Sequence, residues 1–152
     1  CQGAAALSFG CVKNGGLGAE ALVFFDSGLA DLARLRRKRA GHLQSKGRFL
    51  AAQILAMLED GLWLKYADKA NQSAALLAKK LSMIPEAQIV YPVQANAVFE
   101  RLPEHLRRAL QQGGWACYEF IGGGLRFMCS WMTTVEDIDA LCDCLKQAAR
   151  LC

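Results

Sequence analysis

The stretch "LSFGCVKNGGLGAEALVFFD", Leu7 to Asp26, places a single lysine in a glycine-rich turn between two apolar runs. The runs "AALSFGCV" and "AEALVFF" contain β-branched and aromatic residues and are bounded by glycines, so they predict two buried strands joined by a turn. Lys13 lies in that turn. Its side chain is either solvated, as most loop lysines are, or partly desolvated, which would favour the neutral amine and allow it to form a Schiff base.

The length and composition indicate a soluble globular chain. It has 152 residues, 53% of them hydrophobic, which suffices for one compact core or for one domain with part of another. No apolar run reaches the roughly 18 to 20 residues of a membrane-spanning helix, so we expect no membrane partner. The first residues, "CQGAAALSFG", contain neither an initiator methionine nor a signal-peptide pattern. We therefore expect the chain to begin inside a longer protein.

The cysteines predict no metal site. The chain has seven cysteines and two histidines, His42 and His105, without a C-x-x-C pair, so structural zinc is not expected. Our interpretation is that the thiols are reduced and buried as small apolar groups in a cytoplasmic protein. The seven are Cys1, Cys11, Cys117, Cys129, Cys142, Cys144 and Cys152.

One segment is strongly basic, because no acidic residue lies between Asp31 and Glu59. A solvated helix face is one interpretation, and a site for a small anion such as a phosphate on a neighbouring subunit is another. Nucleic-acid binding is not expected, since Phe49 at the edge is the segment's one aromatic residue. The basic residues are Arg34, Arg36, Arg37, Lys38, Arg39, Lys46 and Arg48.

The remaining chain predicts helices and a second, small unit. Helical patterns cover 28–40, 47–60 and 63–82. They are followed by elements in the order β-β-α-β-β-α, which predicts an antiparallel sheet covered by helices. In the last helix, Thr133 and Glu136 have capping-box spacing. Its predicted apolar stripe is Val135, Ile138, Leu141, Leu145 and Ala148.

Motifs for other chemistries are weak. Two histidines without local signatures do not support a Ser-His-Asp or Cys-His site, and "GGLG" and "GGG" are too short to predict phosphate loops. Neither a hydrolase nor a nucleotide-binding protein is expected.

The segment "SFGCVKNGGLGAEALVFF" resembles the surroundings of the cofactor-binding lysine in the threonine aldolase and β-eliminating lyase family. These are fold-type I pyridoxal-phosphate enzymes, and the low-specificity and phenylserine-type aldolases, with their "TKNG" core, are the most similar. The segments "LRRKRAGHLQSKGRFLAAQILAMLEDGLWLKYADKAN" and "GLRFMCSWMTTVEDIDAL" resemble later helices and strands of the family. Val12 and Cys11 depart from its usual threonine and glycine.

The resemblance implies an α/β, PLP-dependent transferase-like fold of type I. Residues 1–29 would be the last strands of the large cofactor-binding domain, 30–82 connecting helices, and 83–152 a small C-terminal α+β domain.

The resemblance also assigns site residues. Lys13 would bind pyridoxal 5'-phosphate covalently and act in catalysis, and Arg126 would bind the substrate α-carboxylate. Lys38 and Ser45 would contact the phosphate of a cofactor in an adjacent subunit. Lys46 or Arg48 is an alternative to Ser45.

The activity implied is retro-aldol cleavage of a β-hydroxy-α-amino acid, of threonine or phenylserine type, to glycine and an aldehyde. The family's phosphate loop, ring-stacking histidine and pyridine-pairing aspartate lie upstream of the lysine and are not found before Lys13. We therefore expect a C-terminal portion, poor or inactive alone, whose exposed strand edge favours a homodimer or homotetramer. The alternative is a non-catalytic dimerising or binding domain with an aldolase-like shape.

Overall fold

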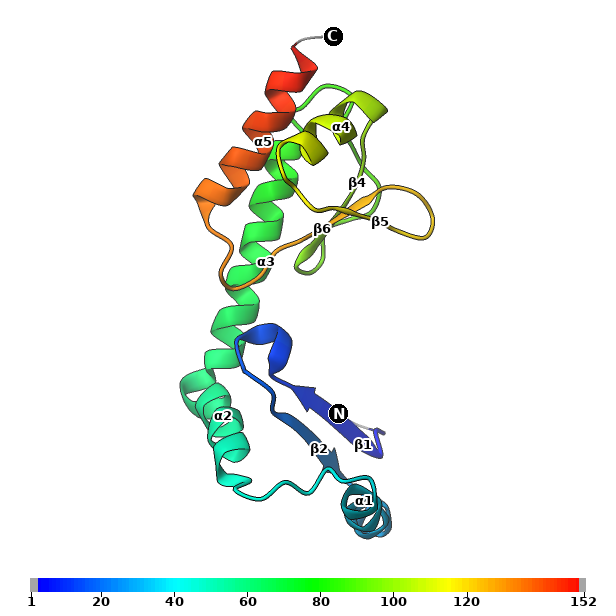
Figure 1. The fold of residues 1–152 in the computed structure, drawn as a ribbon, viewed down its shortest axis with the longest axis vertical. Coiled ribbons are helices and arrows are strands. Elements are labelled where there is room, and N and C mark those ends of the chain that lie inside the picture. Colours follow the sequence, from blue (N-terminus) through cyan, green and yellow to red (C-terminus); the bar gives the residue numbers. More distant parts are fainter. Residues whose placement is uncertain (1–2, 151–152) are drawn as a thin grey trace. The chain divides into compact units, whose positions relative to one another are not determined.

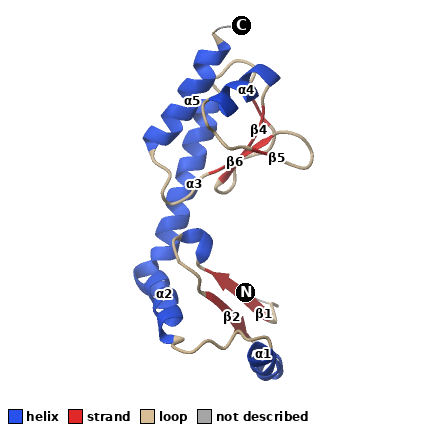
Figure 2. Ribbon diagram, viewed as in Figure 1, coloured by secondary structure: helices blue, strands red, loops and turns tan. Residues whose placement is uncertain are grey.

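The computed structural model describes residues 3–150 and divides into two compact units, one reaching to Lys65 and one starting at Tyr66. Each unit contains its own antiparallel sheet. Figure 1 follows the chain from β1 to α5, and Figure 2 distinguishes helices from strands. None of the helices within residues 3–150 is long and apolar enough to cross a membrane.

The first unit contains two paired strands, a turn and two helices. The strands pair antiparallel, with Ala6 opposite Phe24 and Gly10 opposite Glu20, and η1 lies in the turn between them. Asp26 caps the first helix, because its Oδ1 accepts hydrogen bonds from Gly28 N at 2.8 Å and Leu29 N at 3.4 Å. The elements are β1 (Ala6–Gly10), η1 (Val12–Asn14), β2 (Glu20–Phe24), α1 (Ser27–Arg39), α2 (Arg48–Leu58) and η2 (Glu59–Gly61).

The two strands of the first unit are present as predicted, but the prediction that they are buried is wrong. Leu22 in β2 is 63% exposed and the adjoining Phe25 is 56% exposed. Their sheet has two strands, and a two-stranded sheet cannot cover both of its faces. Within residues 3–150, these strands therefore carry more apolar side chains than the first unit buries.

Helix α3 (Leu62–Leu81) begins in the first unit and ends in the second. It is separated from α2 at Asp60, whose positive φ of 51° interrupts the helical backbone. The three predicted helices over 28–82 are confirmed. Of the predicted domain boundaries, 29/30 falls inside α1 and 82/83 falls just after α3, whereas the compact units meet inside α3. The predicted domain division stays a prediction.

The second unit confirms the predicted order of strands and helices. Its sheet has the order β3-β4-β6-β5 with all neighbours antiparallel. The outer strands, β3 and β5, are shorter than predicted. Pro92 has no N–H group with which to continue the pairing after β3. Trp115 N donates to Leu110 O at 2.9 Å, so Trp115 belongs to the end of the preceding helix and not to β5. The elements are β3 (Gln88–Ile89), β4 (Ala97–Arg101), α4 (Glu104–Gln112), β5 (Tyr118–Glu119), β6 (Leu125–Met128) and α5 (Val135–Ala149).

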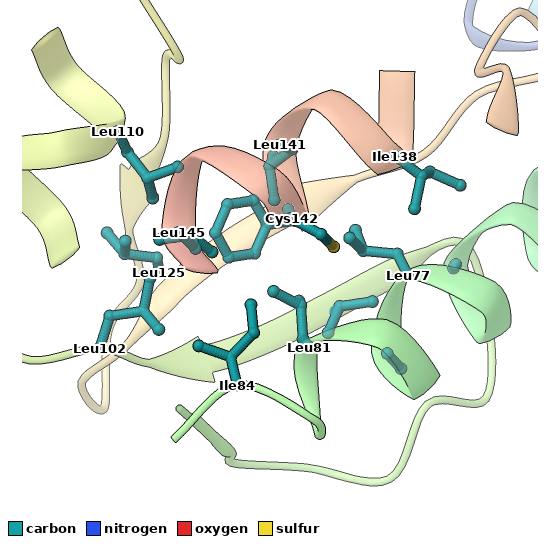
Figure 3. Packing of buried hydrophobic residues seen from close by; sticks show 14 of the residues in the cluster. Leu77, Leu81, Ile84, Leu102, Leu110, Leu125, Ile138, Leu141, Cys142 and Leu145 are labelled. Carbon is teal, nitrogen blue, oxygen red and sulfur yellow. The ribbon is translucent and has the colours of Figure 1, made fainter. Parts of the chain in front are cut away.

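The core of the second unit lies between the sheet and its helices. Leu77 and Leu81 of α3 face Cys142 and Leu145 of α5 (Figure 3), and all four are buried. Val98, Leu106 and Leu110 are fully enclosed as well. Burying a leucine side chain contributes about 1.5–3 kcal/mol, so this cluster is a large favourable term in the folding of the unit.

Two predictions about α5 are wrong in detail. The capping box is formed by Thr134 and Asp137, which exchange hydrogen bonds of 3.0 and 3.1 Å. Thr133 is not the cap because its Oγ1 accepts from Ser130 N at 2.9 Å. Val135, placed on the apolar stripe by its spacing, is 51% exposed because it lies in the first turn, outside the core cluster.

The cysteines among residues 3–150 are free thiols, as predicted. Cys11, Cys129 and Cys142 are buried, and Cys117 and Cys144 are half-buried. Burial raises the pKa of Cys11, Cys117, Cys129 and Cys142 above the usual thiol value. Cys1 and Cys152 lie outside the described residues.

A buried carboxyl group lies in the core of the second unit. Glu100 is 0% exposed, on the same face of β4 as Val98 and Leu102, between Ile89 of β3 and Leu125 of β6. Neither of its carboxyl oxygens has a hydrogen-bond partner among the described residues. Burial raises the pKa of this group to about 7. At neutral pH a large fraction of Glu100 is therefore protonated.

Candidate functional site

The turn that carries Lys13 is built around one backbone carbonyl. Cys11 O accepts hydrogen bonds from Asn14 N at 3.0 Å and Gly16 N at 2.8 Å, which closes the single 3₁₀ turn of η1. Gly15 follows with φ of 102°, a conformation that favours glycine. The turn therefore fixes the backbone of Lys13 on both sides.

Gly16 is required for packing. A Cβ atom at this position would lie 2.6 Å from Cys11 Cβ, whereas a Cβ at Gly18 would meet no atom within 4 Å. Cys11 is buried below the turn. Packing thus requires a glycine at position 16 but not at position 18, a difference that the sequence alone does not show.

Residues distant in sequence hold the turn in place. Asn14 Nδ2 donates to Trp63 O at 2.9 Å, and Gln53 Oε1 accepts from the N–H groups of Leu17 and Gly18 at 2.9 and 3.2 Å. The rings of Phe9 and Trp63 also meet edge to face at 5.5 Å. Sequence reasoning missed Gln53 and Trp63, because no local pattern links them to residues more than 30 positions away.

Lys13 itself is exposed. Of the two alternatives for its side chain, the solvated one therefore holds in the described unit, because no segment within residues 3–150 of this unit encloses it. The arrangement that remains is a rigid turn presenting an accessible primary amine. Such an amine can attack a carbonyl carbon if a further surface aligns the two groups.

Arg126 lies on the sheet of the second unit. In β6 it is opposite Phe99 of β4 and Tyr118 of β5, and its guanidinium carbon lies 5.7 Å from the centre of the Phe120 ring. Its Nε is enclosed and has no hydrogen-bond partner among the described residues. The two terminal nitrogens are not among the enclosed atoms. Two parallel N–H donors of this kind match the two oxygens of a carboxylate.

A pocket of about 280 Å³ adjoins Arg126. It is lined mainly by apolar side chains such as Trp115 and Leu141, together with Cys117 and Asp137. Hydrogen bonding to Thr134, first of all to its backbone N–H, lowers the pKa of Asp137, so this carboxylate is ionised at neutral pH. The pocket therefore combines an apolar lining with one cation and one anion.

Lys38 and Ser45 lie in the connection between α1 and α2. Lys38 is in the last turn of α1 and Ser45 is in the turn before α2, and both are exposed. Arg37 Nε donates to His42 O at 3.2 Å, which folds the connection back on the helix end. The structure leaves both interpretations of this basic segment open, a solvated face or a small-anion site. Lys13, Lys38 and Ser45 belong to the first unit and Arg126 to the second.

Comparison with known proteins identifies relatives over most of the chain. No protein-family model matches it. The low-specificity L-threonine aldolase of Pseudomonas aeruginosa is 48% identical over 136 residues, which are 89% of this chain and 39% of that protein. The chain is thus related to the threonine aldolases. A second low-specificity L-threonine aldolase, from another Pseudomonas strain, is 48% identical over 128 residues, 84% of this chain and 37% of that protein.

Solved structures support the same relationship to threonine aldolases. A threonine aldolase from Leishmania major superposes with a TM-score of 0.85 and 25% identity, covering 95% of this chain and 43% of that one. Glycine decarboxylase, the P-protein of the glycine cleavage system, superposes with a TM-score of 0.56 and 21% identity, covering 94% of this chain and 34% of the decarboxylase chain. This second likeness supports the fold alone. The predicted α/β fold of type I is confirmed. The chain spans about two fifths of the length of its curated threonine aldolase relatives.

Proposed function

We propose that this chain is the C-terminal portion of a pyridoxal-phosphate-dependent aldolase that cleaves a β-hydroxy-α-amino acid, of threonine or phenylserine type, to glycine and an aldehyde. The observation that carries the proposal is the 48% identity to low-specificity L-threonine aldolases over 136 residues. The exposed lysine in a fixed turn supports it. The portion acts in the cytoplasm and is poor or inactive alone.

The residues of this chain fit part of a pyridoxal-phosphate site. Lys13 offers an accessible amine on a turn whose backbone is fixed, as covalent attachment of an aldehyde requires. Arg126 offers two terminal nitrogens as N–H donors on a half-buried side chain. Lys38 and Ser45, or Lys46 or Arg48 in place of Ser45, supply charge and hydrogen-bond donors for the phosphate of a cofactor held by a neighbouring subunit.

In this proposal each residue has a limited task. When bound, the cofactor supplies the electron sink that permits cleavage between Cα and Cβ. Lys13 would hold the cofactor through its side-chain amine, and Arg126 would hold the α-carboxylate of the substrate. Fixing the carboxylate at one end sets the direction of the scissile bond, and such alignment accounts for a large part of enzymatic rate acceleration.

The proposed assembly is a homodimer or homotetramer. The side chains of Leu22, Val23 and Phe25 are exposed on and next to β2, and a two-stranded sheet with exposed apolar side chains favours coverage by another chain. Light scattering of the purified chain tests this point, and a monodisperse monomer across the micromolar range contradicts it.

The cofactor claim is tested by adding pyridoxal phosphate, reducing with borohydride and mapping the modified peptides by mass spectrometry. We expect an adduct on Lys13, none in the Lys13→Ala variant, and an unchanged adduct in the matched control Lys65→Ala, which alters another exposed lysine. Labelling spread evenly over all lysines would refute the cofactor role. Threonine cleavage by the chain alone would refute the claim that it is incomplete.

The second candidate is a non-catalytic dimerising or binding domain derived from an aldolase. The exposed apolar side chains of the first unit favour it, since they serve assembly whether or not a cofactor binds. A stable dimer that gives no Lys13 adduct supports this alternative over the first.

A further inference from the structure

The hairpin between β5 and β6 has a shape that three consecutive glycines allow. Gly122, Gly123 and Gly124 have φ values of 102°, 85° and 108°, a region that residues with a Cβ rarely adopt. A Cβ at Gly124 would also lie 3.0 Å from Glu100 O. The "GGG" motif, too short for a phosphate loop, therefore serves a tight hairpin that lies close against β4.

This hairpin fixes the position of Phe120. Its backbone N–H donates to Gly124 O at 2.9 Å, and its carbonyl accepts from Gly123 N at 3.0 Å. Both polar groups of the Phe120 backbone are thus engaged by the glycine turn. These two hydrogen bonds fix the backbone of Phe120, and the fixed backbone limits the directions that the Phe120 side chain can take.

The ring of Phe120 is also held by other aromatic rings on the same side of the sheet. It meets Phe99 at 4.8 Å with an interplanar angle of 62°, and Phe99 meets Tyr91 at 5.6 Å with 81°. Phe99 is in turn the cross-strand neighbour of Arg126. The guanidinium of Arg126 therefore borders a connected aromatic surface, within the roughly 6 Å over which a cation is attracted to a ring face.

We propose that Phe120 is a positioning residue for Arg126, holding its guanidinium so that the two terminal nitrogens, and not Nε, are offered to a carboxylate. The proposal deepens the function proposed above and rests on Arg126 being the carboxylate-binding residue. Among the described residues, Nε is both enclosed and without a hydrogen-bond partner. The terminal nitrogens are not among such enclosed atoms. A long, flexible side chain that is held in one orientation before binding loses less conformational entropy when the carboxylate arrives.

The test observes the Arg126 Nε–H group by NMR in the ¹⁵N-labelled 152-residue chain, with neither cofactor nor substrate. In the native chain we expect its proton to be shifted upfield by the Phe120 ring current and its heteronuclear NOE to be that of an ordered group. Phe120→Leu should move both values toward those of the exposed arginines, and Phe120→Tyr should keep the native values. Because cation–π contacts at partly exposed sites are modest, a roughly two- to fivefold loss of the ordered conformer is expected.

The matched control is Ile121→Ala, which changes the neighbouring, 93% exposed residue of the same hairpin and should leave the Arg126 signal in place. An unchanged Arg126 signal in Phe120→Leu, or an equal change in Ile121→Ala, overturns the proposal. Dispersed spectra of each variant establish that it is folded. Because the measurement requires no pyridoxal phosphate, its failure is distinct from the absence of a Lys13 adduct, which would refute the proposed function instead.

Discussion

The buried carboxyl group of Glu100 makes the stability of the second unit depend on pH. Burial raises its pKa from the ordinary 4.5 to about 7, so the folded unit retains a proton that the unfolded chain releases. The stability that this group contributes is therefore fully present below about pH 4.5, falls as the pH rises from there, and is lost above about pH 7. Since a tenfold change in an ionisation constant corresponds to about 1.4 kcal/mol, this single group changes the free energy of unfolding by about 3 kcal/mol.

Urea unfolding between pH 4 and pH 8 measures this effect. In a Trp63→Phe background, the fluorescence of Trp115 and Trp131 reports on the second unit. Glu100→Gln keeps the shape of the side chain and removes the titration, so its stability should be higher than that of the parent at pH 8 and similar at pH 4. The remaining ionisable groups are common to both proteins, so their effects on stability cancel in the difference.

The result that refutes this reasoning is a constant difference between Glu100→Gln and its parent over the whole pH range. Glu100→Leu gives a second check. It removes two oxygens that lack hydrogen-bond partners among the described residues, and we expect it to be more stable than the parent at pH 8 by more than Glu100→Gln is.

Three further predictions concern stability and are measured by denaturant or thermal unfolding. Thr134→Ala removes the α5 cap and should cost about 1 kcal/mol; no loss would show that the capping box is not formed. Gly16→Ala forces a contact with Cys11 and should cost about 1–3 kcal/mol, whereas Gly18→Ala, which meets nothing, should cost much less; equal losses contradict the packing role. Leu145→Ala should cost about 2–5 kcal/mol and the exposed Val135→Ala under about 0.5 kcal/mol; similar values would contradict the position of the core.

Much of the fold could be predicted from sequence because local patterns determine it. The helices that contain Leu77 and Leu141 follow a 3.6-residue apolar period, and Pro85 marks the end of the first of them. The cap of α5 was assigned one residue too early. Two adjacent threonines satisfy the same local rule, and the hydrogen bond from Ser130 N to Thr133 Oγ1 decides between them.

The site was less predictable because it depends on contacts between distant residues. The position of Lys13 in a turn could be predicted from the flanking apolar runs and glycines, but the exposure of Lys13 could not, since it depends on which segments cover the turn. Glu100 shows the same limit, because a glutamate in an alternating strand gives no sign that it is buried. Phe120 could have been noticed from its place two positions before the first of the three glycines.

The buried thiols are divided between the two units. Cys11 belongs to the first unit, and Cys129 and Cys142 belong to the second. A buried thiol reacts with an alkylating reagent only when its surroundings open, so alkylation rates measure local opening in the way that amide exchange does. The native sequence therefore carries separate probes for the opening of each unit, and mass spectrometry of alkylated peptides can show whether the two units open together or independently.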